Sequence, residues 1–279
     1  PPLNSAANTR RSRIHGAHQL YQEMPTSTLA DEILTPGEGQ VRALVVIGGN
    51  PMTSWPDRDP EMDEAAEALA RSWNIARAAQ DAWAVDSHRK ARMAEMRSEV
   101  VPLAGVERDT FTRDLTPRLA ARAPGLVGSI TAANAAVAAD GAAVCLLVSD
   151  RVAARLPDPG LAYRGGITLG ARPDLPGVAP VEAIGALFDR TGTTPADLSV
   201  AEVMEAYAVQ AIACVEGAGL DPAIVNPGGG GLARGHPVGA SGAINAVRLW
   251  HEVKRRGGTG LAAIAAAGGL GTAVMLSVR

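Results

Sequence analysis

The second half of the chain alternates strand-like and helix-forming segments, and this alternation limits the fold more than any other feature of the sequence. The segments, in order, are a strand at 142–148, a strand at 161–171, a helix at 181–192, a strand at 198–208, a helix at 209–219, a helix at 241–256, and the final strands TGLAAIAAAGG and LGTAVMLSV. Proteins in which strands and helices alternate along the chain usually cover a sheet with helices. We therefore expect a layered α/β fold from about residue 129.

The preceding region, 61–128, is rich in helix formers and predicts two or three amphipathic helices. Asp63 stands before the first helical run, and Asn74 is a candidate break or cap. His88 is expected to be an exposed helix residue. A solvated helix face is expected for Arg77, Asp81, Arg89 and Arg92.

Charge and cysteine content exclude several classes of protein. The net charge is −3 and the arginines are scattered among carboxylates, so no basic patch predicts nucleic-acid binding. No apolar run reaches the roughly 18 residues of a membrane span. Cys145 and Cys214 lie inside apolar stretches without metal-site spacing, which predicts buried reduced thiols, no metal site and a cytoplasmic protein.

The stretch GGGGLARGHPVGASGA (228–243) places one histidine, His236, between Gly235 and Pro237 in a glycine-rich loop. Glycine lets a ligand or another strand approach the main chain closely. A histidine held in such a loop is a candidate functional residue, and the helix after it begins with small residues.

Five segments, in this order along the chain, resemble the thiolase family, whose members condense or cleave acyl groups on coenzyme A. NIARAAQDAWAVDSH resembles the family's helical insertion that covers the coenzyme, and SITAANAAVAADGAA resembles TAGNAS-x-x-DGAA. MEAYA is similar to NEAFA, NPGGGGLARGHPVGASGA to the histidine loop, and AAAGGLGTA to C-x-G-G-G-x-G. The resemblance covers residues 61–279, about the last three-fifths of a thiolase.

This resemblance implies a thiolase-like layered αβαβα architecture that is incomplete. We expect a helical coenzyme-covering insertion at 61–128 and a core at 129–279 that is mainly the C-terminal half of a thiolase. Such a half would expose a face that its missing partner normally covers, a liability for aggregation or oligomerisation.

The resemblance also assigns roles to individual residues. His236 would be the partner of a cysteine nucleophile, held in place by Gly235 and Pro237. The remaining expected roles are oxyanion-binding main chain at Ala267 and Gly268, loop organisation at Glu205, and contact with coenzyme A at Ala132 and Ala136. The expected ligand is a coenzyme A thioester, with no covalently bound cofactor.

Several polar catalytic positions of the family are apolar in this chain. Ala265 stands where the family has its acid/base cysteine, and Met204 where it has an asparagine that holds a water in the oxyanion hole. No cysteine precedes Cys145, so the family nucleophile is missing, and neither Cys145 nor Cys214 is expected to be accessible enough to replace it. The expected activity is therefore a degenerate acetyl-CoA acetyltransferase. The alternative is a non-catalytic thiolase-like subunit that binds acyl-CoA without reacting or packs against a catalytic partner. The expected partners are a second copy of the chain or a thiolase-like chain.

Residues 1–58 carry a different resemblance. MPTSTLADEILTPGEGQVRALVVIGGNPMTSWPD resembles an internal fragment of a molybdopterin oxidoreductase, which predicts a separate segment at 1–60. Its apolar run 41–49 predicts a strand, for which pairing with an exposed sheet edge is one possibility. The fragment lacks a metal ligand and should not bind molybdenum. A third alternative takes this segment as primary and makes the chain a fragment of an oxidoreductase.

Overall fold

The computed structural model describes residues 43–49, 60–94, 99–103, 105–266 and 268–279. The chain divides into two compact units. The larger unit comprises Val46–Cys145 and Gly160–Arg279, and the smaller unit includes residues 43–45 and Leu146–Pro159. The elements described below belong to the larger unit unless stated otherwise, except that the strands at 43–49 and 142–148 are each divided between the two units.

A four-stranded mixed sheet forms the centre of the larger unit. Its strands, in spatial order, are β5 (Ala162–Gly170), β8 (Leu270–Ser277), β7 (Thr259–Ala266) and β6 (Leu198–Val203). β7 runs parallel to β6 and antiparallel to β8, and β8 runs antiparallel to β5. The sheet therefore presents alternate residues of β7 to two different faces.

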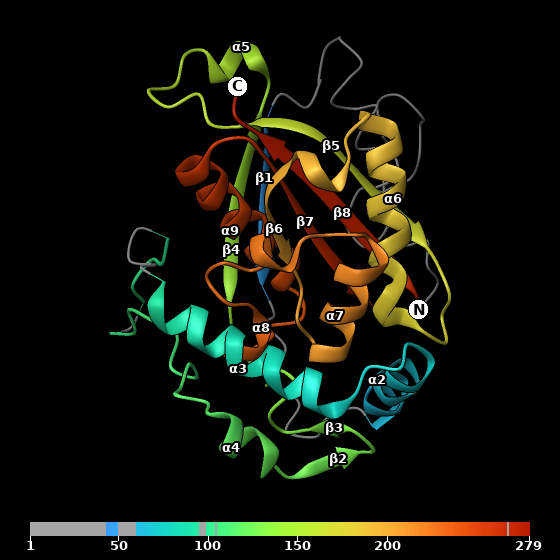
Figure 1. Cartoon of the computed structure of the whole chain (residues 1–279). Coiled ribbons are helices and arrows are strands. Elements are labelled where there is room, and N and C mark those ends of the chain that lie inside the picture. Colours follow the sequence, from blue (N-terminus) through green and yellow to red (C-terminus); the bar gives the residue numbers. More distant parts are fainter. Residues whose placement is uncertain (1–42, 50–59, 95–98, 104, 267) are drawn as a thin grey trace, which may run out of the picture. The chain divides into compact units, whose positions relative to one another are not determined.

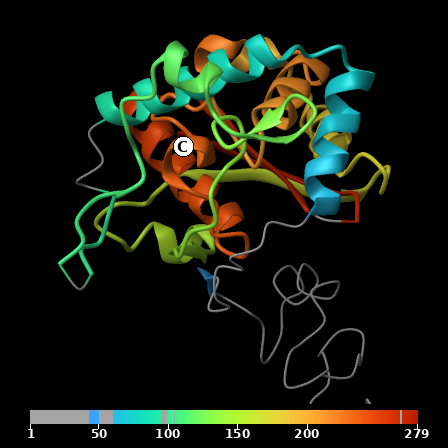
Figure 2. The same ribbon diagram turned by 90° about the horizontal axis from the view of Figure 1, so that it is seen from below.

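Helices cover both faces of this sheet, as Figures 1 and 2 show. On one face, α6 (Ala179–Thr191) and α7 (Ala208–Gly217) pack against Leu261 and Ala263 of β7. On the other face, Leu249 and Val253 of α9 (Ser241–Arg256) pack against Ala262. The result is a three-layer α/β/α arrangement, as the alternating pattern predicted.

The predicted helical region contains three helices: α2 (Pro60–Ser72), α3 (Arg77–Met93) and α4 (Pro117–Ala121). α2 packs its apolar face against α7, and α3 contributes Ala84 to a cluster with Ala208 and Leu232. Asn74 separates α2 from α3 with a left-handed φ of 53°, so its prediction as a helix break is confirmed.

Several short elements complete the fold. They are the small β2–β3 pair (Gly125–Val127 with Ile130–Thr131), the single-turn helices α5 (Asp150–Ala153, in the smaller unit) and α8 (Gly231–Arg234), and the 3₁₀ turns Pro176–Val178, Pro195–Asp197 and Pro222–Ile224. The predicted strands at 41–49 and 142–148 are also found, as β1 (Ala43–Gly49) and β4 (Ala142–Val148). They pair with each other in a two-stranded sheet rather than with the four-stranded one.

Three expectations about single residues were wrong. His88 is buried, with 1% of its surface exposed, because the inward face of α3 is itself polar and includes Gln80 and Ser87. Asp63 lies inside α2 and accepts a hydrogen bond of 2.7 Å from the Tyr207 hydroxyl, so it does not begin the helix.

Cys145 is only half-buried, because β4 pairs with β1 and with no other described strand, and it is exposed or half-exposed along its whole length. Cys214 is buried, as predicted. Of the predicted solvated face, Arg89 and Arg92 are exposed, whereas Arg77 and Asp81 are half-buried. Within the part of the chain that the structure describes, no helix combines the length and apolar character needed to span a bilayer.

Candidate functional site

Main-chain hydrogen bonds bring three distant stretches of sequence together. The amide of Ala136 donates to the carbonyl oxygen of Ala206 over 2.9 Å, and the amide of Ala208 donates to that of Asn134 over 2.8 Å. The amide of His236 donates to the carbonyl oxygen of Val137 over 2.8 Å. The stretch at 129–141 therefore lies between the segment that follows β6 and the loop that carries the histidine.

The end of β7 joins the same region. The amide of Met204 donates to the carbonyl oxygen of Ala263 over 2.9 Å, and a Cβ placed on Gly242, at the start of α9, would lie 3.7 Å from the Ile264 side chain. Three of the five segments noted in the sequence thus meet at one end of the sheet, and a fourth, 265–273, follows directly after Ile264. The fifth, α3, reaches this region through Glu205, as described below.

The glycine-rich loop requires glycine at two positions for steric reasons. Gly229 has a φ of 74°, and a Cβ there would lie 2.8 Å from the Ala91 amide nitrogen on α3. Gly235 has a φ of 94°, and a Cβ there would lie 2.6 Å from the Ala139 methyl group. The loop is thereby pressed against α3 on one side and against the 129–141 stretch on the other.

The imidazole of His236 is half-buried, and Nδ1 lies 2.7 Å from the Ser241 hydroxyl oxygen. Ser241 opens α9 and also donates to the carbonyl oxygen of Pro237 over 3.1 Å. Burial lowers the pKa of His236 from 6.5 to about 4, so the ring is neutral at pH 7. A neutral imidazole has one nitrogen free to accept a proton or a hydrogen bond.

Glu205 is a buried carboxylate with four hydrogen-bond donors and 1% exposure. Trp83 Nε1 and Ser87 Oγ donate from α3 over 3.0 and 2.7 Å. Asn226 Nδ2 and the Leu232 amide donate from the loop over 2.8 and 3.2 Å. The carboxylate thus joins α3 to the two ends of the glycine-rich segment.

Asn226 holds the start of this loop and was not singled out from the sequence. It has a left-handed φ of 44°, its Oδ1 accepts from the Val203 amide over 2.7 Å, and its Nδ2 donates to the Val203 carbonyl over 2.8 Å. Its side chain therefore takes the place of a neighbouring strand at the end of β6. An asparagine directly before Pro227 and the glycine run was the available signal for a special backbone conformation.

Ser241 is the second residue that sequence reasoning missed. The stretch GASGA was noted for its small residues, yet its hydroxyl is the hydrogen-bond partner of the His236 ring. A hydroxyl in the first turn of the helix that follows a candidate histidine was the signal.

The positions expected to be degenerate lie in the same region. Met204 is buried, and a Cβ on Gly231 would lie 2.5 Å from its terminal methyl group. Ala265 is half-buried in β7 and pairs with Gly271. Gly268 is exposed, with a φ of 80° and nothing within 4 Å of a Cβ placed on it. Ala267 lies outside the described residues.

Ala132 and Ala136, the expected coenzyme contacts, are both half-buried. The Ala132 amide donates to the carbonyl oxygen of Pro124 over 3.0 Å. Both alanines belong to the stretch that contacts the histidine loop, and Asn134 between them is fixed by Asp81, with Nδ2 lying 3.1 Å from Oδ1.

Neither cysteine resembles an activated nucleophile. Burial raises the pKa of the Cys214 thiol to about 12, and its sulfur lies 3.1 Å from the carbonyl oxygen of Gly177. Burial also raises the pKa of Cys145, whose sulfur lies 4.0 Å from the carbonyl oxygen of Ala243. A reactive cysteine needs the opposite shift. No group of histidine, cysteine and acidic side chains in the described ranges could hold a metal ion.

A buried ion cluster lies behind the loop. The Arg248 guanidinium contacts Glu99, Glu202 and Glu252, and it also lies where a side chain on Gly228 would be. Burial raises the pKa of Glu202 to about 8, whereas Glu252, which accepts from three arginines, has its pKa lowered to about 2. Removing Arg248 would leave the buried Glu202 carboxyl without the cation that contacts it, whereas Glu99 and Glu252 would keep Arg255.

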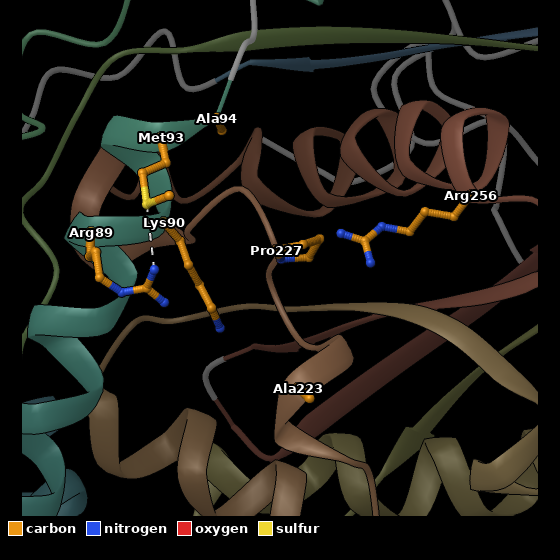
Figure 3. A pocket seen from close by; sticks show the side chains of 7 residues that line it. All are labelled: Arg89, Lys90, Met93, Ala94, Ala223, Pro227 and Arg256. Carbon is orange, nitrogen blue, oxygen red and sulfur yellow. Dashed lines mark hydrogen bonds between the residues drawn. The ribbon is translucent and has the colours of Figure 1, made fainter.

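A hollow of about 300 Å³ near the end of α3 is a separate candidate (Figure 3). It is lined by Arg89, Lys90, Met93, Ala94, Ala223, Pro227 and Arg256. Its three cations already contact acidic groups: Arg89 and Lys90 pair with Asp86 over 2.5 and 3.0 Å, and Arg256 pairs with Glu252 over 2.9 Å. None of the site residues expected from the sequence lines it.

Family models match nearly the whole of the described chain. The family model "Thiolase, N-terminal domain" matches residues 38–151, and "Thiolase, C-terminal domain" matches residues 161–278. The chain belongs to the thiolase family. The match at 161–278 includes β5 to β8, α6, α7, α9 and the His236 loop.

Individual thiolases agree with this assignment. The Bacillus subtilis (strain 168) protein YhfS, named as a candidate acetyl-CoA C-acetyltransferase, is 39% identical over 233 residues, which cover 79% of this chain and 64% of that protein. Human mitochondrial 3-ketoacyl-CoA thiolase in complex with CoA superposes with a TM-score of 0.78 at 26% identity, covering 86% of this chain and 72% of that one. The dimeric peroxisomal thiolase of Saccharomyces cerevisiae gives a TM-score of 0.78 at 27% identity, with coverages of 90% and 72%. The thiolase-like α/β fold is therefore confirmed.

The chain spans between 50% and 64% of the length of the curated relatives it matches. The match to the thiolase N-terminal domain begins at residue 38, inside the segment that resembles a molybdopterin oxidoreductase. Nothing in the comparisons supports that second resemblance. Residues 1–42 and 50–59, on which most of it rests, lie outside the described residues.

Proposed function

We propose that this thiolase-family chain binds acyl-CoA thioesters beside His236 and takes part in acyl transfer of the acetyl-CoA acetyltransferase type. The observation that carries the proposal is the neutral, Ser241-bonded imidazole of His236, held where the 129–141 stretch and the segment after β6 meet. CoA-bound human mitochondrial thiolase, which shares this fold, supports CoA as the ligand.

In this proposal His236 accepts a proton from a thiol. A neutral imidazole beside a cysteine favours the thiolate, which attacks the thioester carbonyl and displaces CoA as its thiol. The oxyanion formed in that step needs main-chain donors, for which we propose Ala267 and Gly268. Glu205 organises the loop, because all four of its hydrogen bonds hold other groups in place.

We further propose that the 279 residues turn over slowly or not at all when alone. Cys145 and Cys214 are their only cysteines, and both have raised pKa values. Ala265 and Met204 offer no proton-transfer group beside the histidine. These features favour the alternative of a non-catalytic subunit that binds acyl-CoA and a second, thiolase-like chain. A cytoplasmic location stays a prediction.

The test combines binding with turnover. Isothermal titration with acetyl-CoA and CoA should show saturable binding, and thiolysis of acetoacetyl-CoA by CoA to two acetyl-CoA should stay at the rate without protein. Turnover that His236→Asn abolishes, but His251→Asn leaves intact, would identify an enzyme with the assigned histidine. Turnover that survives His236→Asn would refute the assigned role, and absence of binding to either ligand would refute the acyl-CoA site.

A steric variant tests the location of the coenzyme. Ala136→Tyr puts a large ring in the half-buried stretch proposed to contact CoA and should weaken CoA binding at least tenfold. Ala82→Tyr, at an exposed position on α3, is the matched control and should leave the affinity unchanged. Equal affinities for the two variants would place the ligand elsewhere.

A further inference from the structure

Ser241 is the only residue among those described that hydrogen-bonds the His236 ring. The Nδ1–Oγ distance is 2.7 Å, and Ser241 is 2% exposed, so water does not compete for this contact. Burial of a hydroxyl is favourable only when its hydrogen bonds are made. The direction of the bond therefore affects the chemistry of the ring.

The hydroxyl has one proton and Nδ1 can act as donor or acceptor, so two arrangements fit the 2.7 Å contact. Oγ lies 3.1 Å from the carbonyl oxygen of Pro237, which has no proton to give and can only accept. Once Ser241 donates there, its oxygen is left to accept from Nδ1–H of His236. The neutral ring then carries its one proton on Nδ1, and Nε2 keeps a free lone pair.

The local backbone holds this geometry in place. The amides of Ala240 and Ser241 both donate to the carbonyl oxygen of Pro237, over 2.7 and 3.0 Å, so the turn before α9 fixes the serine relative to the proline. The amide of His236 is anchored on Val137 on the other side of the ring. Serine and histidine are thus each held by main-chain bonds that do not depend on their own contact.

We propose that Ser241 is a positioning residue that locks His236 in the Nδ1–H tautomer and so presents Nε2 as the proton acceptor. The lock itself stands on the geometry alone, and only the identity of the thiol that meets Nε2 rests on the proposed function. Without the serine hydroxyl, Nδ1 has no acceptor in the described structure, and the ring is free to take the Nε2–H form that histidine prefers in water. That form would turn the acceptor into a donor.

The experiment is a long-range ¹H–¹⁵N correlation spectrum of the full chain labelled with ¹⁵N-histidine at pH 7. His236→Asn assigns the His236 signals by their disappearance. In the wild type, the protonated-nitrogen shift should fall on Nδ1. In Ser241→Ala it should move to Nε2, and Ser241→Thr, which keeps the hydroxyl, should return it to Nδ1.

Ser199→Ala is the matched control, because it removes another partly buried hydroxyl that bonds main-chain oxygens, those of Gly257 and Thr259, without touching a histidine. A wild-type spectrum with the proton on Nε2 overturns the proposal, as does a Ser241→Ala spectrum identical to wild type. The wild-type measurement suffices if the alanine variant does not fold. If the protein failed to bind CoA, the proposed function would be refuted, but the spectra would still show which tautomer His236 adopts.

Discussion

At the scale of the residue, His88 shows how burial without an acidic partner lowers the pKa of a histidine. Its Nδ1 accepts from the Arg113 amide over 3.3 Å, and its Nε2 is buried without a hydrogen-bond partner in the described structure. Burial, aided by the positive charge of Arg113, lowers its pKa from 6.5 to about 4. Protonation is therefore easier in the unfolded chain than in the folded one.

This shift makes His88 a source of acid sensitivity. The stability that the neutral ring contributes is complete above pH 6.5 and is lost as the pH falls through 4. His88→Gln removes the titration while keeping an oxygen for the Arg113 amide. Between pH 7.5 and pH 5 the variant should lose about 2 kcal/mol less unfolding free energy than wild type, measured by urea denaturation. Parallel losses in the two proteins would contradict the assignment.

Glu205 gives the second prediction at this scale. Glu205→Gln keeps the shape but replaces one accepting oxygen by an NH₂ group. That group then faces either the Oε1 donors, Trp83 Nε1 and Asn226 Nδ2, or the Oε2 donors, the Ser87 hydroxyl and the Leu232 amide. We expect a loss of about 2–3 kcal/mol of unfolding free energy, because a buried donor is left unpaired. Thermal and urea unfolding measure it. The control, Glu216→Gln on the exposed side of α7, should change stability by less than about 0.5 kcal/mol, and equal effects would contradict the role given to Glu205.

How much of the site the sequence predicts depends on distance along the chain. His236 was identified because its loop glycines and Pro237 are its immediate neighbours. The bond from Ser87 to Glu205 joins residues 118 positions apart, and no local pattern contains that pairing. The polar inward face of α3 was missed for a related reason, since the spacing of Gln80, Ser87 and His88 is helical but their chemistry suggests exposure.

At the scale of the element, helices and strands end where a particular residue interrupts them. Gly192, with a φ of 65°, ends α6 as predicted. β6 ends at Val203, earlier than the predicted 208, because the Asn226 side chain pairs with the Val203 main chain. Here a side chain from a distant part of the sequence takes the place of a strand partner. The local sequence pattern could not predict that contact.

Two glycine substitutions should have opposite effects on stability. Gly229→Ala should cost at least about 2 kcal/mol, because the left-handed φ of 74° disfavours a side chain and the Cβ would overlap α3 at Ala91. Gly185→Ala should add about 0.5–1 kcal/mol, since it lies in α6 with nothing within 4 Å of the new methyl group. Urea unfolding checks both. If both substitutions raised the unfolding free energy, or both lowered it, the packing around each glycine would not be what decides the effect.

At the scale of the whole molecule, the sequence predicted the thiolase family, since that assignment follows from the order of its motifs. The comparisons give no support to its second resemblance, and the match to the thiolase N-terminal domain already begins at residue 38. Val144 on β4 is 58% exposed, although the strand sequence AAVCLLV has the composition of a core.

This exposure predicts self-association or binding of a thiolase-like chain. The yeast relative is dimeric. Val144→Thr keeps the β-branched shape and replaces a methyl group by a hydroxyl, so it should weaken the association. Sedimentation velocity over a range of concentrations would show it as a shift toward smaller species. An unchanged distribution, with Val152→Thr on α5 as the control, would mean that β4 lies outside the contact.

The contact between Gly228 and the Arg248 guanidinium has a consequence for how this protein can change over evolutionary time. Any side chain at position 228 would displace an arginine whose counterions come from β6, from α9 and from Glu99. A run of glycines usually suggests tolerance to drift. Here a replacement of Gly228 would be tolerated only together with changes in Arg248 and its carboxylate partners. We therefore expect the glycine run to be among the slowest-evolving segments of the chain.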